Sequence, residues 1–124
     1  MRDSLISYLA ARNGSDALEE AFFEAPVMLQ ITDAEGIITR VSDHWCAVLG
    51  HGPEEAIGRR ADAFLTEEAR RHARLYVEPA FRLTGWCDGV RYDMVRRDGS
   101  VLPVRLSAAA LGSWRGAGDA PGGA

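Results

Sequence analysis

The side chains best suited to ligate a metal or to act as nucleophiles in this chain are three histidines and two cysteines. His44, Cys46 and His51 lie close together, but intervals of two and five residues do not match the usual spacing of zinc ligands. Two cysteines are too few for a disulfide framework, and no cation can be placed beside Cys87 to activate its thiol. We therefore expect no metal site and an unreactive Cys87.

Sequence patterns of the common enzyme classes are missing as well. The chain has no Gly-rich phosphate loop, no G-x-S-x-G segment and no H-E-x-x-H segment. A histidine-kinase phosphoacceptor box with its ATP-binding domain does not fit into 124 residues. The sequence thus predicts a protein without catalytic residues, which at most regulates an enzyme.

Composition is ordinary for one globular domain, with 47% hydrophobic and 26% charged residues. A net charge of −4 disfavours a nucleic-acid partner, because such a partner requires a basic surface. No apolar run approaches the roughly 20 residues that span a bilayer, and the N-terminus lacks the apolar core of a signal peptide. We expect a cytoplasmic protein that does not contact a membrane.

In the first third of the chain, hydrophobic spacing predicts two helices followed by two strands. Leu5, Ile6 and Leu9 favour a helix over 3–12, and a second helix is expected from Ser15 to Ala25. Alternation predicts strands over 27–32 and 37–41, joined by a tight turn that ends at Gly36. In the first strand, Val27, Leu29 and Ile31 share one face, which we take as the inward one.

Short helices, one long helix and a hairpin are expected next. Ser42 or Asp43 begins a helix that runs to Leu49, and Pro53 opens another. A longer helix starts near Thr66 and is kinked or ended by Pro79. Asp98-Gly99 joins two strands, of which the second runs over 101–108. From Gly112 the Gly-rich composition predicts a flexible tail.

Three segments together resemble the PAS domains of bacterial histidine kinases and cyclic-dinucleotide signalling proteins. They read V-S-D-x-W-C-x-V-L-G, P-E-E-A-I-G-R and V-R-R-D-G-S-V-L-P-V-R-L-S-A. The resemblance implies an α+β fold in which an antiparallel sheet carries helices on one face. It divides the chain into an N-terminal helical dimerisation segment (1–24), a PAS domain (25–111) and a flexible tail (112–124).

The family's sheet has five strands, and its fifth strand lies between the first and the fourth. Here the chain becomes Gly-rich where that strand should begin, so we expect it to be missing and the chain to be a fragment. The first and fourth strands would then pair directly, or accept a strand from another copy, or be covered by the N-terminal segment. We favour a homodimer whose interface is formed by the apolar residues of the N-terminal segment, namely Leu5, Ile6, Leu9, Leu18, Phe22 and Phe23.

The resemblance further implies a sensory or protein-interaction module of a signal-transduction system, such as a two-component system. It would bind a small ligand or a partner and signal to a downstream protein through dimer contacts. We expect the pocket walls at Leu29, Ile31, Leu49, Phe64, Leu65, Tyr76, Met94 and Leu106.

Two alternative functions remain open. Haem-binding relatives use a histidine on the long helix, which implies His72 as an iron ligand in a gas sensor. The other alternative is a dimerisation module that fills its pocket with its own side chains. Covalent flavin photochemistry is not expected, because no cysteine lies between Gly58 and Leu65, whereas a non-covalent flavin stays open.

Overall fold

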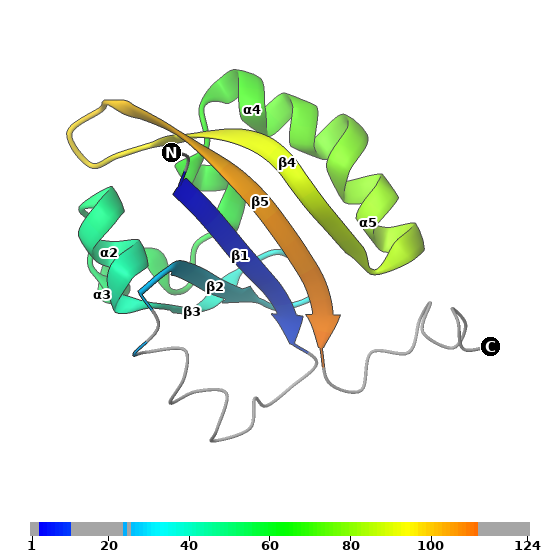
Figure 1. Cartoon of the computed structure of the whole chain (residues 1–124), viewed down its shortest axis with the longest axis horizontal. Helices are drawn as coiled ribbons and strands as arrows, with labels where there is room; N and C mark the ends of the chain where they lie inside the picture. The colour runs from blue at the N-terminus through cyan, green and yellow to red at the C-terminus, as the bar shows by residue number, and fades with distance from the viewer. Residues whose placement is uncertain (1–2, 11–23, 25, 112–124) are drawn as a thin grey trace.

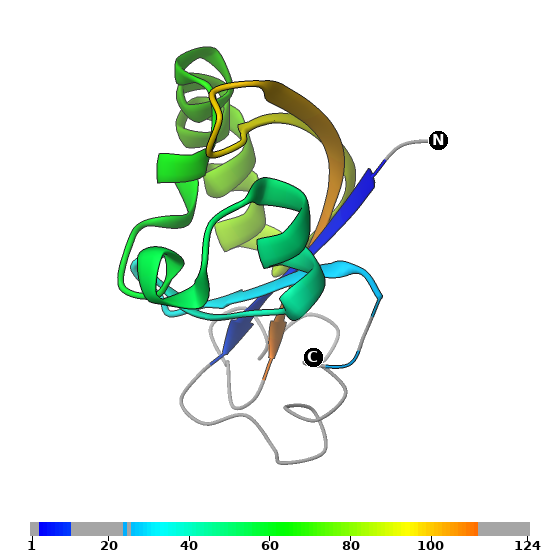
Figure 2. The same cartoon turned by 90° about the vertical axis from the view of Figure 1, so that its left-hand side faces the viewer.

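The computed structural model describes residues 3–10, 24 and 26–111, which form one sheet with helices on one of its faces (Figures 1 and 2). The five strands lie in the order β3-β2-β1-β5-β4. Their bounds are β1 Asp3–Ala10, β2 Met28–Thr32, β3 Ile38–Val41, β4 Trp86–Val95 and β5 Val101–Leu111. The α+β fold class predicted from the sequence is confirmed.

Strand β1 occupies the centre of the sheet and runs parallel to both of its neighbours (Figure 1). Leu5 pairs with Met28 of β2 on one side and with Leu106 of β5 on the other. The predicted helix over 3–12 is therefore wrong for residues 3–10. A short apolar run fits the residue period of a helix as well as that of a strand. Here two neighbouring strands offer hydrogen-bond partners to the backbone, and this favours a strand.

The sheet consequently has all five strands, which corrects the expectation that the fifth is missing. Of the three expected ways to cover the central edges, the N-terminal segment is the one observed. The sheet is also mixed rather than antiparallel, since both ladders of β1 are parallel. The second predicted helix, over 15–25, falls almost wholly outside the described residues.

Three short helical segments connect β3 to the long helix: α2 Asp43–Leu49, α3 Pro53–Ala56 and η1 Ala61–Phe64. The N-cap of α2 is Ser42, which is fully buried. Its Oγ accepts hydrogen bonds from the amides of Trp45 and Leu29 and donates to the carbonyl of Val27. One buried hydroxyl thus caps the helix and fixes it to strand β2.

The long helix consists of α4 Glu67–His72, a π-helical segment η2 Ala73–Val77 and α5 Glu78–Thr84. Thr66 caps it as predicted, since its Oγ1 accepts from the Ala69 amide at 3.1 Å. The π-helical segment ends at Val77, two residues before Pro79, which has no amide proton to give to the preceding turn. The wider turn accommodates the proline without ending the helix, and it rotates the face that follows. No helix among the described residues is long and apolar enough to cross a membrane.

The main core lies between the helices and the inner face of the sheet. Each strand presents alternate residues to it, so Leu5, Met28 and Leu106 face inward. Leu29 and Ile31 form a separate cluster on the opposite face, together with half-buried Ile6 and Tyr8 and the neighbouring Val27. The inward face of β2 is therefore the one that carries Met28, Gln30 and Thr32, opposite to the expected one.

If β1 is part of the folded sheet, Leu5→Ala should lower the free energy of unfolding by about 2–5 kcal/mol, because Leu5 is only 1% exposed. Leu83→Ala, at a side chain that is 79% exposed, is the matched control and should change it by less than about 0.5 kcal/mol. Urea unfolding of both variants checks this. Equal, small effects would mean that β1 does not pack in the core.

Candidate functional site

A cavity of about 600 Å³ lies between the long helix and the inner face of the sheet. Its walls are mainly apolar. They come from β1, β2, β4 and β5, from the β2–β3 turn and η1, and from the η2 and α5 parts of the long helix. The apolar side chains that line it include Leu9, Leu65, Ala73, Val77, Met94 and Leu106. Such a mostly apolar space with a few polar groups is the usual form of a small-molecule site.

Polar side chains of β1 and β2 face this cavity. Gln30 of β2 and Ser7 of β1 line it, and both sit on the inner face of the sheet. The indole Nε1 of Trp45 donates to Gln30 Oε1 at 3.1 Å, and Gln30 Nε2 donates to Ser7 Oγ at 3.3 Å. Because an indole N–H can only donate, the orientation of the Gln30 amide is fixed.

Strand β4 contributes Tyr92 and Cys87 to the cavity wall. Burial, followed by the charges of Cys87, Glu78 and Asp62, raises the pKa of Tyr92 well above its usual value. Burial also raises the pKa of Cys87, against a hydrogen bond with Ala108 that lowers it. Both groups are therefore neutral at pH 7, which agrees with the expectation that Cys87 is an unreactive thiol.

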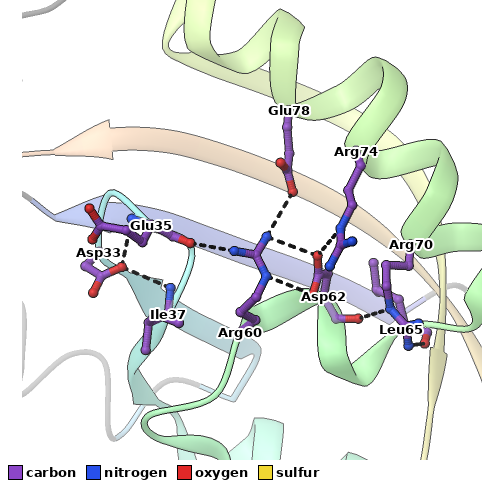
Figure 3. A network of polar contacts seen from close by, with 9 residues as sticks. All are labelled: Asp33, Glu35, Ile37, Arg60, Asp62, Leu65, Arg70, Arg74 and Glu78. Atoms are coloured by element: carbon purple, nitrogen blue, oxygen red, sulfur yellow. Dashed lines mark hydrogen bonds and ion pairs between the residues drawn. The ribbon is translucent and has the colours of Figure 1, made fainter.

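A network of charged groups lies at the rim of the cavity, where Arg60 joins three elements (Figure 3). Its guanidinium donates to both carboxylate oxygens of Asp62, at 3.3 and 3.1 Å, and to the carbonyl of Glu35 at 2.9 Å. A longer ion pair of 3.8 Å reaches Glu78 on α5. Arg60 therefore connects the β2–β3 turn, segment η1 and the long helix.

Asp62 is the buried centre of this network, with a side chain that is only 8% exposed. Arg74 Nε donates to its Oδ2 at 2.9 Å, and Arg70 Nε donates to its main-chain carbonyl at 3.1 Å. Burial alone would raise the pKa of Asp62, but the hydrogen bonds and charges of Arg60 and Arg74 outweigh burial and lower it. Two guanidinium groups thus keep a buried carboxylate ionised.

Of the eight side chains predicted to form the pocket, Leu65, Met94 and Leu106 line the cavity. The others lie elsewhere: Leu49 and Phe64 are core residues that do not line it, Leu29 and Ile31 lie on the opposite face of the sheet, and Tyr76 is 64% exposed. The prediction failed at β2 because the inward face was assigned to its more apolar side. It failed at Tyr76 because this residue lies within the π-helical segment, where side chains do not keep the α-helical spacing on which the prediction rested.

His72 is exposed at the end of α4, where its ring lies 5.1 Å from that of Tyr76. It does not line the cavity, so a haem bound there would obtain no axial ligand from His72. The described residues also contain no group of three or more histidine, cysteine, aspartate or glutamate side chains placed to hold a metal ion.

The predicted dimer interface changes because β1 belongs to the sheet. Leu5 is buried in the core and Leu9 lines the cavity, so neither is free to contact a partner as predicted. Ile6 is half-buried on the opposite face of the sheet. The remaining predicted interface residues, Leu18, Phe22 and Phe23, lie outside the described residues.

Sequence reasoning missed the polar side chains of the site, among them Ser7, Gln30, Arg60 and Asp62. Ser7 was missed with its whole strand. Gln30 alternates with Leu29 and Ile31 in the sequence, and its polarity suggested a solvent-facing position. The R-x-D spacing of Arg60 and Asp62 was the available signal, because the arginine could have been paired with the nearby carboxylate.

The family model of the PAS domain matches residues 24–119, and this chain belongs to that family. PAS domains are in general sensory rather than catalytic modules. No curated protein matches the chain.

Several solved PAS domains have a similar fold. A PAS domain from Colwellia psychrerythraea is 22% identical, with a TM-score of 0.62, over 68% of this chain and 71% of that one. The PAS domain of an HTR-like protein from Haloarcula marismortui is 27% identical, with a TM-score of 0.60, over 73% and 78%. A third belongs to a LuxR-family transcriptional regulator from Burkholderia thailandensis and was solved in complex with ethanol. It is 18% identical, with a TM-score of 0.55, over 68% and 74%.

The lowered pKa of Asp62 makes part of the stability depend on pH. The ionised Asp62 carboxylate stabilises the folded state fully above its ordinary pKa of 3.8. This stabilisation is lost as the pH falls through the lower pKa that Asp62 has in the folded protein. The stability advantage of the wild type over Asp62→Asn should therefore be constant near neutral pH and shrink below about pH 4. Urea unfolding across this range measures it.

Asp88→Asn is the control, because the exposed Asp88 bonds to Ser107 outside the network. Should the stability difference between wild type and Asp62→Asn not change with pH, the paired carboxylate would contribute nothing to folding.

Proposed function

We propose that this PAS domain is a sensor that binds a small, mostly apolar molecule in the cavity between the long helix and the sheet. The observation that carries the proposal is the cavity of about 600 Å³ itself, whose lining includes buried residues of the main core. Ligand pockets are typically mainly apolar spaces of about 300–1,000 Å³ with a few polar groups, so a space of this size and lining suits a ligand. This favours ligand binding over a module that fills its pocket with its own side chains.

The same cavity is suited to pass on a signal. Its walls combine β1 at the sheet centre, the β2–β3 turn and the long helix, and Arg60 connects the last two. A ligand that packs differently against the helix and the sheet in two states would shift the population between those states. We propose that a downstream signalling protein or domain responds to this shift.

A homodimer, a bacterial two-component setting and a cytoplasmic location remain predictions from the sequence. The structure alters only the first of these. Because residues 3–10 belong to the sheet, a dimer would have to use other surfaces than a helix formed by that segment.

A cavity-filling variant tests the proposal. Ala108 of β5 lines the cavity, whereas the adjacent Ala109 points to the other face of the sheet. Ala108→Phe should weaken binding of the neutral dye N-phenyl-1-naphthylamine by at least about tenfold, while Ala109→Phe should change it by less than about twofold. Dye fluorescence in a titration gives the affinity, and thermal unfolding verifies that both variants fold.

Two results would refute the proposal. The first is wild-type protein that binds the dye without saturation. The second is equal binding by both folded variants, because the dye would then occupy another surface.

A further inference from the structure

The cavity contains a hydrogen-bond donor that is not used by the described part of the chain. Trp45 donates to Gln30, and Gln30 in turn donates to the Ser7 hydroxyl. A serine hydroxyl that accepts a hydrogen bond still has its own hydrogen to donate. None of the described residues accepts that hydrogen, and Ser7 lines the cavity.

The direction of this chain of hydrogen bonds is fixed at its buried end. The Trp45 side chain is fully buried and its indole N–H can only donate, so Gln30 Oε1 must be the acceptor. Gln30 Nε2 then faces Ser7 as a donor, and Gln30 itself is only 5% exposed. The core thus fixes the Ser7 hydroxyl as the acceptor from Gln30 and leaves its hydrogen available to donate into the cavity.

The charges around the cavity favour an uncharged ligand. Asp62 is paired with Arg60 and Arg74, so the two guanidinium groups are already engaged. Asp33, Glu35 and Glu78 add further carboxylates to the lining, against Arg82. The raised pKa of Tyr92, due first to burial and then in part to Glu78 and Asp62, agrees with surroundings that oppose a further negative charge. The lining therefore holds more carboxylates than guanidinium groups, and a carboxylate ligand would lose hydration beside an excess of negative charge.

We infer that the cavity selects a neutral molecule whose apolar body carries a carbonyl-type oxygen, and that this oxygen accepts a hydrogen bond from Ser7. This inference rests on the proposed ligand-binding function and specifies the chemical class of the ligand. Ser7 is then a specificity-determining residue, and Gln30 is a positioning residue that acts through it. Ketones, esters, lactones and amides of suitable size belong to this class.

Two fluorescent probes that differ in one acyl group test the inference. Prodan, a neutral naphthyl ketone, has the carbonyl oxygen, and 2-dimethylaminonaphthalene lacks it. Ser7→Ala should weaken prodan binding by about five- to tenfold and leave binding of the second probe within about twofold. Emission of bound prodan should also move to shorter wavelength in Ser7→Ala, because a hydrogen bond to the carbonyl lowers the energy of the emitting state.

Matched variants separate the donor from general effects on folding. Ser7→Thr keeps a hydroxyl in the strand and should retain most of the prodan affinity and the wild-type emission. Ser107→Ala removes a hydroxyl that bonds to Asp88 on the other face of β5. It should change neither the prodan affinity nor the emission of bound prodan.

The outcomes distinguish this inference from the proposed function. If N-phenyl-1-naphthylamine binds in the cavity but prodan affinity and emission are the same in wild type and Ser7→Ala, the selection of a carbonyl oxygen is overturned and the ligand cavity stands. If the wild type binds none of the three probes, the ligand cavity itself is overturned, and the inference fails with it.

Discussion

The structure depends on one strand, β1, which hydrogen-bonds to β2 on one side and to β5 on the other. Without it, two rows of backbone groups at the centre of the sheet would have no ladder partners. The same strand supplies Leu5 to the core and Ser7 and Leu9 to the cavity. One strand therefore completes both the sheet and a wall of the candidate site.

The inward face of β2 is the second constraint, since one register step would reverse the position of every side chain. Two buried polar contacts specify it. Ser42 bonds to the amide of Leu29, and Trp45 bonds to Gln30. If β2 were reversed, Gln30 would leave its indole partner and a buried donor would remain unsatisfied. Polar groups in the core thus select the arrangement that places an amide, rather than Leu29 or Ile31, beside the cavity.

Much of the fold could be predicted from the sequence, because local signals agree with the tertiary structure there. Gly36 and Gly99 adopt the positive φ angles that their turns require, and Thr66 and Pro79 act on the long helix as their chemistry implies. The secondary structure of residues 3–10 could not be predicted, because the spacing of their apolar residues also fits a helix. Only pairing with β2 and β5 makes this segment a strand. The site was predicted at Leu65, Met94 and Leu106 and missed where a π-helical segment or a reversed strand face changed the direction of a side chain.

Hydrogen exchange of the β1 amides, followed residue by residue by NMR, tests the central claim that this segment is the middle strand of the sheet. The account predicts that the amides of residues 5–9 exchange as slowly as those of residues 29–31 in β2, because both segments lie inside the sheet ladder. Rapid exchange of the β1 amides, while β2 and β5 remain protected, would contradict it. The cavity would then lack the wall to which Ser7 belongs.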